Sequence, residues 1–153
     1  MTTDNDDELH NIFREAVEDY CRYEGIDDID AVLAGAIIVR DSHFLRFELL
    51  HESALCRILI TMPRPPDEVA AEASAWMLRA NFDEASDYLL MFSLHPDTGD
   101  PVLMLHVPPH RLMEADSIGE AVDAALEEID RWEALIQKMR QQTSADPHLF
   151  LSP

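Results

Sequence analysis

The amino-acid sequence predicts an α+β fold, with one antiparallel twisted sheet packed against three helices. Three observations predict it. Apolar residues recur every three or four positions near both ends of the chain, as in amphipathic helices. Between the ends, short segments rich in β-branched and aromatic residues follow one another with brief turns, which favours antiparallel pairing. The length of 153 residues, 47% of them hydrophobic, suits one core, so we expect a single domain over residues 1–142 and a flexible tail at 143–153.

The first expected element is an amphipathic helix over about residues 6–24. The acidic run at residues 4–8 lies where a helix N-terminus favours negative charge, and Gly25 is a typical helix stop. The apolar stripe consists of Leu9, Ile12, Phe13, Ala16, Val17 and Tyr20.

Three strands are expected next, at residues 34–41, 43–52 and 54–62, separated by Asp-Ser and Glu-Ser breaks. Side chains alternate between the two faces of a strand. One face, expected in the core, carries Leu45, Phe47, Leu49, Cys56, Ile58, Ile60 and Met62. The other face carries Phe44, Arg46, Glu48, Leu50, Leu55, Arg57, Leu59 and Thr61. A fully solvated face would hold fewer large apolar residues, so this second face is expected to contact something.

A second helix should follow the proline-rich run at residues 62–66, because proline cannot continue a central strand. We expect Asp67 to cap this helix and the helix to end near Asn81. Its apolar stripe is Val69, Ala73, Trp76, Met77 and Ala80, with Leu78 beside it.

A hairpin and a long helix complete the predicted fold. The hairpin strands lie at residues 87–95 and 101–107, and the helix begins at a capping box formed by Ser117 and Glu120. The inner positions of this helix are Ile118, Val122, Ala125, Ile129, Trp132, Ile136 and Met139.

The hairpin also holds His95, Asp97, Asp100 and His106, which are residues that a metal site or an acid/base pair would use. Proline, aspartate and glycine in the connecting order favour a tight turn. The segment lacks the alternating ligands of a calcium loop, and no third ligand joins the two histidines to hold zinc. We therefore interpret it as a turn and expect no metal or other cofactor. A small metal-dependent enzyme using His95, Asp97 and His106 is the least favoured alternative.

The charge of the chain restricts its partners. With 31 acidic and 11 basic residues, the net charge is −20, which repels nucleic acid and anionic membranes. The N-terminus lacks the basic start and apolar centre of a secretory signal, and no apolar run could span a membrane, so we expect a cytoplasmic protein. Cys21 and Cys56 fit no metal or redox pattern and are expected to be reduced and buried. With neither a nucleophile motif nor a phosphate-binding loop, we expect no enzyme.

The order of these elements, together with the acidity, resembles the class I type III secretion chaperones, the CesT-like or Tir chaperone family. Four stretches carry the resemblance: the acidic first helix, AWMLRANF at the end of the second helix, LLMFSLHPDTGDPVLML in the hairpin, and ALEEIDRWEAL in the last helix. The resemblance covers about residues 5–140.

The resemblance implies a homodimer without enzymatic activity in the bacterial cytoplasm. Such a dimer binds the N-terminal region of a secreted effector in extended form and presents it to the secretion ATPase. Family members that bind a regulator instead of an effector are the alternative. The resemblance assigns effector contact to Phe44, Leu50, Leu55, Leu59, Ile12 and Phe13. It assigns the dimer interface to Trp76, Met77, Ala80, Leu103 and Leu105.

Overall fold

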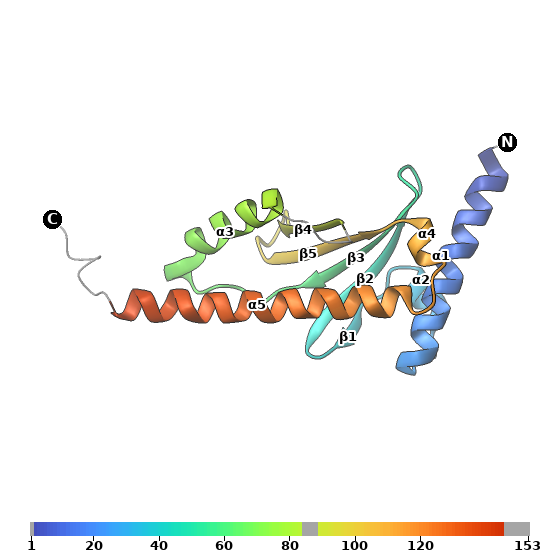
Figure 1. The fold of residues 1–153 in the computed structure, drawn as a ribbon. Helices are drawn as coiled ribbons and strands as arrows, with labels where there is room; N and C mark the ends of the chain where they lie inside the picture. Colours follow the sequence, from blue (N-terminus) through green and yellow to red (C-terminus); the bar gives the residue numbers. More distant parts are fainter. Residues whose placement is uncertain (1, 84–88, 146–153) are drawn as a thin grey trace.

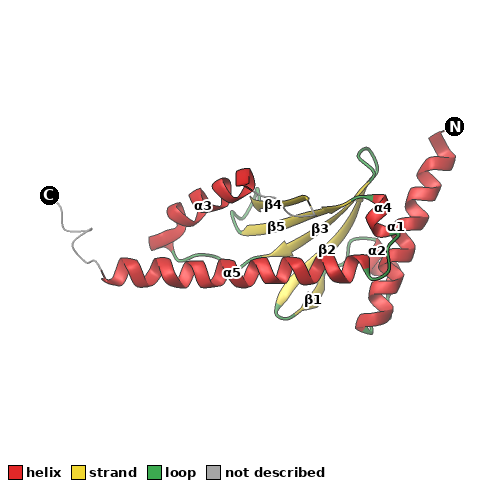
Figure 2. Cartoon of the chain, viewed as in Figure 1, coloured by secondary structure: helices red, strands yellow, loops and turns green. Residues whose placement is uncertain are grey.

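The computed structural model describes residues 2–83 and 89–145, and it confirms the α+β class (Figures 1 and 2). The elements are α1 (Thr2–Glu24), α2 (Ile29–Leu33), β1 (Ile38–Arg40), β2 (His43–Leu50), β3 (Leu55–Thr61), the 3₁₀ helix η1 (Asp67–Val69), α3 (Ala70–Asp83), β4 (Leu89–Leu94), β5 (Pro101–Val107), α4 (Pro109–Leu112) and α5 (Ser117–Ala145). The three long helices and five strands follow one another in the predicted order.

All five strands form one antiparallel sheet in the order β1-β2-β3-β5-β4. The connection between β1 and β2 is so short that Asp41 and Ser42 both take positive φ, 49° and 70°, as tight hairpin turns require. Strand β1 spans only three residues, and the expected longer strand is wrong. The residues before β1 instead connect it to α2, a short helix that we did not predict. Gly35 lies in this connection and has a positive φ of 90°.

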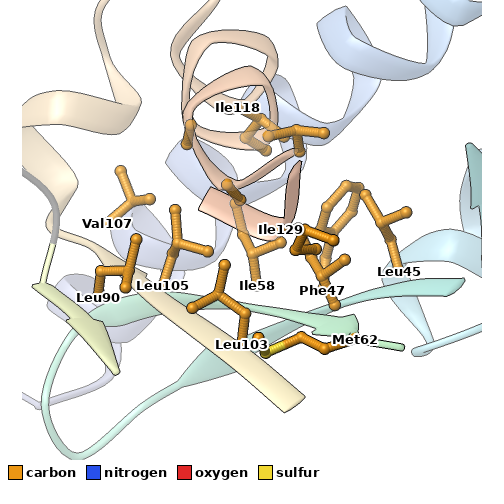
Figure 3. Packing of buried hydrophobic residues seen from close by; sticks show 14 of the residues in the cluster. Leu45, Phe47, Ile58, Met62, Leu90, Leu103, Leu105, Val107, Ile118 and Ile129 are labelled. Atoms are coloured by element: carbon orange, nitrogen blue, oxygen red, sulfur yellow. The ribbon is translucent and has the colours of Figure 1, made fainter. Parts of the chain in front are cut away.

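Helix α5 runs along one face of the sheet, α1 crosses one end of it at a steep angle, and α3 lies beside β4 (Figure 1). The predicted inner faces of β2 and β3 point toward these helices, with Phe47, Ile58 and Ile60 each at most 1% exposed. All seven predicted inner positions of α5 are buried. Figure 3 shows Ile118 and Ile129 of α5 above Leu45, Phe47, Ile58 and Leu103 of the sheet.

Both predicted helix caps are wrong. Pro66 precedes the 3₁₀ turn η1 and occupies the position before the helix, while Asp67 lies inside the turn. Ser117 is the first residue of α5, and its hydroxyl donates a hydrogen bond to the carbonyl oxygen of Leu112 (3.1 Å). The backbone carbonyl of Asp116 instead accepts the first helical bond, from the N–H of Glu120 (2.9 Å).

Helix α5 also continues through Thr143–Ala145, which we expected in the tail. The hydroxyl of Thr143 bonds the carbonyl oxygen of Met139 one turn earlier (3.0 Å). The rest of the expected tail, residues 146–153, lies outside the described residues, as do residues 87 and 88 of the predicted first hairpin strand.

Two tryptophans connect α3 to α5. The indole N–H of Trp132 donates to the carbonyl oxygen of Pro63 (2.9 Å), in the segment that leads into α3. The ring of Trp76 lies 5.7 Å from that of Trp132 and 5.3 Å from the ring of Phe92 on β4. These contacts fix α3 against both the long helix α5 and the edge strand β4.

Candidate binding face on the sheet

The sheet has a second face, which we call the outer face, made of the residues that point away from the helices. None of its residues in β2, β3, β4 or β5 is buried, whereas their inward-facing neighbours are nearly all buried. The most exposed apolar side chains on this side are Ile37 (67%), Val39 (64%), Leu89 (60%), Phe44 (52%) and Met91 (39%). An antiparallel sheet tolerates water on one face, but such a face is normally polar.

Strand register arranges the outer face in rows that run across the sheet. The first row is Val39, Phe44, Thr61, Val102 and Ser93. The second row is Arg46, Leu59, Met104 and Met91. The third row is Glu48, Arg57, His106 and Leu89. The first two rows are mainly apolar, and charge is concentrated where the second row meets the third.

A hollow of about 540 Å³ lies on the outer face. Its volume is within the range typical of binding sites for small ligands or a few side chains. Its lining includes Ile37, Phe44, Arg46, Arg57, Leu59 and Met104. The hollow therefore combines an apolar floor with two guanidinium groups.

The two arginines share one carboxylate. Arg57 donates to Oε2 of Glu48 through Nε (2.9 Å) and also through Nη2, and Arg46 donates to Oε1 through Nη2 (2.5 Å). Burial raises the pKa of Glu48, but the hydrogen bonds and positive charges of Arg57 and Arg46 outweigh it, so that the pKa lies below its ordinary value. Glu48 is therefore ionised at neutral pH and holds both guanidinium groups in place.

Most of the predicted partner-contact residues lie on the outer face. Phe44 is 52% exposed, and Leu50, Leu55 and Leu59 are partly exposed. On α1, Ile12 is partly exposed, but Phe13 is only 2% exposed and belongs to the core. The assignment of Phe13 to partner contact is therefore wrong. Ile12 and Phe13 belong to the same apolar stripe of the helix, and the sequence pattern does not show which of the two side chains is buried more deeply.

The predicted dimer residues need a larger correction. Met77 (3% exposed), Leu103 (0%) and Leu105 (0%) are core residues and offer no surface to a second copy. Trp76 and Ala80 are only partly buried. The large apolar side chains that α3 exposes are instead Leu78 (72%) and Phe82 (91%), four positions apart and therefore on one side of the helix. The four-residue spacing of Leu78 and Phe82 can be read from the sequence, but our predicted helix ended near Asn81 and therefore did not include Phe82.

The hairpin residues form a turn. The backbone N–H of Gly99 donates to the carbonyl oxygen of His95 (2.8 Å), and the His95 ring nitrogen Nδ1 accepts bonds from the N–H groups of Asp97 and Thr98. His106 lies opposite Leu89 at the far end of the hairpin, about 20 Å along the strands from His95. The two histidines do not converge. Across residues 2–83 and 89–145, no group of three or more histidine, cysteine, aspartate or glutamate side chains is placed to hold a metal ion.

The two edges of the sheet differ. At the β4 edge, the side-chain amide of Asn81 donates to the carbonyl oxygen of Phe92 (2.9 Å) and accepts from its N–H (2.7 Å). The amide thus makes the pair of bonds that a neighbouring strand would make, and it blocks strand addition at this point. The β1 edge has no such cover in the described part of the chain, but it is short.

Comparison of the chain with known protein families, with characterised proteins and with solved structures found no match. The resemblance to secretion chaperones therefore rests on the sequence pattern and the order of the elements. No helix in the described ranges has both the length and the apolar character needed to cross a membrane.

Proposed function

We propose that this protein is a type III secretion chaperone without enzymatic activity, acting in the bacterial cytoplasm. In this role it binds the N-terminal region of a cognate effector in extended form and delivers it to the secretion apparatus, including its ATPase. The single observation that carries the proposal is the outer face, an apolar sheet surface with a hollow of about 540 Å³ and no cover from the described helices. Exposed apolar surfaces of this kind usually mark sites for partner proteins.

An extended segment suits the shape of this face. Its side chains alternate in direction, so every second residue can enter the hollow while the intervening residues stay in water. Binding would shield Phe44, Leu59 and Met104 from solvent and keep the segment from folding on its own. A partner held in this way is unfolded but protected from aggregation, which is the state that secretion through a narrow channel requires.

We further propose that the protein forms a homodimer through α3. Leu78 and Phe82 expose large apolar side chains on one side of this helix. We expect the double variant Leu78→Ser/Phe82→Ser to elute as a monomer in size exclusion with light scattering, and the matched α3 variant Glu72→Ala to remain dimeric. A wild-type protein that is monomeric at micromolar concentration would refute the dimer.

The binding proposal is tested by purifying the tagged protein from a bacterium with a type III secretion system and identifying retained proteins by mass spectrometry. We expect a secreted effector, bound through its N-terminal region. The variants Leu59→Glu and Met104→Glu, which place a charge in the hollow, should lose it. Tyr23→Glu, at a residue of α1 that is 81% exposed, is the matched control and should retain it. Retention of a regulatory protein at the same face would identify the alternative, a regulator-binding protein. Retention that Leu59→Glu and Met104→Glu leave unchanged would contradict a role for the outer face.

A further inference from the structure

We infer that the outer face selects partner segments carrying a carboxylate beside apolar residues, and that Arg46 and Arg57 bind this carboxylate. The inference rests on the proposed function and specifies the partner's chemistry. It is unexpected for a chain of net charge −20, whose surface as a whole repels acidic ligands.

The first argument is the local charge. The ion pairs of the described residues contain one carboxylate that is shared by two arginines, Glu48. In the other ion pairs of the described residues, each arginine has one carboxylate partner or two. Arg14, for example, pairs with both Glu18 and Asp30. The Arg46–Glu48–Arg57 cluster therefore carries one excess positive charge on an otherwise acidic protein.

The second argument is the unused hydrogen-bonding capacity of the cluster. Arg57 bonds Glu48 through Nε and Nη2, and Arg46 does so through Nη2. Within residues 2–83 and 89–145, no other acceptor bonds either guanidinium group, although each has five N–H donors. The Arg46 and Arg57 side chains are 46% and 31% exposed, so their remaining N–H groups can reach a ligand. A second carboxylate would neutralise the cluster and use these donors.

The third argument is the surroundings of the cluster. Arg46 lies directly opposite Leu59, and Leu59 lies opposite Met104 in the same row. A carboxylate at Arg46 would therefore be flanked by apolar surface within the hollow. In an extended segment, residues two positions apart point the same way about 7 Å apart. The expected pattern is an aspartate or glutamate two positions from a large apolar residue.

A test with defined probes separates this inference from the proposed function. Random twelve-residue peptides displayed on phage are selected on the immobilised full-length protein. The tightest peptide and its amide counterpart, with Asp→Asn or Glu→Gln, are then measured by fluorescence anisotropy. We expect selected peptides to be apolar and enriched in acidic residues, and the amide counterpart to bind about three- to tenfold more weakly.

Variants of the cluster give effects of opposite sign. Arg46→Gln and Arg57→Gln should weaken binding of the acidic peptide and leave the amide peptide unchanged. Glu48→Gln should strengthen binding of the acidic peptide, because it removes the competing carboxylate. Arg22→Gln on α1 makes the same change in net charge at a distance and should have no effect. Thermal melting confirms that each variant is folded.

The outcomes are distinct. Peptides that bind the outer face without acidic enrichment, or an acidic peptide whose affinity is unchanged in Glu48→Gln and both arginine variants, would overturn the inference and leave the proposed function standing. Failure to select any peptide whose binding is lost in Met104→Glu would overturn both.

Discussion

Replacing Asn81 with alanine should destabilise the protein through the edge of the sheet. The change removes two hydrogen bonds to the backbone of Phe92, at 2.9 and 2.7 Å, and leaves the N–H and C=O groups of Phe92 without these partners. At about 0.5–1.5 kcal/mol for each bond, the loss is about 1–3 kcal/mol. Alanine's better helix propensity offsets about 0.5 kcal/mol, which leaves a net loss of about 0.5–2.5 kcal/mol. For a domain of this size, at about 3 °C for each kcal/mol, the melting temperature should fall by about 2–8 °C.

The assay is thermal unfolding followed by circular dichroism, with urea unfolding to give the free energy directly. The exposed α3 variant Glu72→Ala is the control for changes in helix propensity. Asn81→Asp retains an acceptor for the N–H of Phe92 but places a carboxylate against its carbonyl oxygen, so it should be at least as unstable as Asn81→Ala. An Asn81→Ala protein that melts within 1 °C of wild type would show that these bonds contribute nothing and that the edge is held by packing alone.

Three further predictions concern the core and the charged cluster. Trp132→Phe removes the indole hydrogen bond to Pro63 and part of the ring contact with Trp76, so the free energy of unfolding measured in urea should fall by about 2–4 kcal/mol. A decrease below about 1 kcal/mol would be inconsistent with the full burial of Trp132. Because the pKa of Glu48 is lowered on folding, its ionised form contributes stability above the unfolded value of about 4.3 and loses it as the pH falls through the folded value. The difference in unfolding free energy between wild type and Glu48→Gln should therefore be constant near neutral pH and shrink in acid, and a constant difference down to pH 3 would contradict the ion pairing. Burial raises the pKa of the Cys56 thiol to about 12, so a thiol reagent at pH 8 should modify Cys56 only in urea, and rapid native labelling would show that the core opens.

The elements best predicted from the sequence were those with unambiguous periodicity. Helix α5 places an apolar residue at every third or fourth position over six turns, and all of its predicted inner positions are buried. Burial in β3 alternates as predicted, with Cys56, Ile58 and Ile60 inside. The caps failed for a different reason. Ser117 has the right residue type at the right spacing, but Asp116, with a φ of 56°, turns the chain one residue earlier. Cap identity depends on the backbone path into the helix, which residue spacing does not specify.

The assignment of residues to a dimer interface failed where both faces of an element are apolar. In β5, Val102 and Met104 alternate with Leu103 and Leu105, so composition could not show which pair faces the helices. The burial pattern resolves this in favour of Leu103 and Leu105 as core. The outer face itself was anticipated, because Phe44, Leu55 and Leu59 were too apolar for a solvated surface. Its hollow and the sharing of Glu48 depend on how three strands are paired, which the sequence alone does not give.

The position of α5 after all five strands in the sequence has a consequence for synthesis on the ribosome. The sheet is complete once β5 has emerged at Val107, but the residues that cover much of its core face, from Ile118 to Met139, are made afterwards. During that interval the nascent sheet lacks its main cover on the core face and has none on the outer face, and it is most exposed to aggregation. A chain that ends at residue 116 should consequently be found in inclusion bodies, even though it contains every strand.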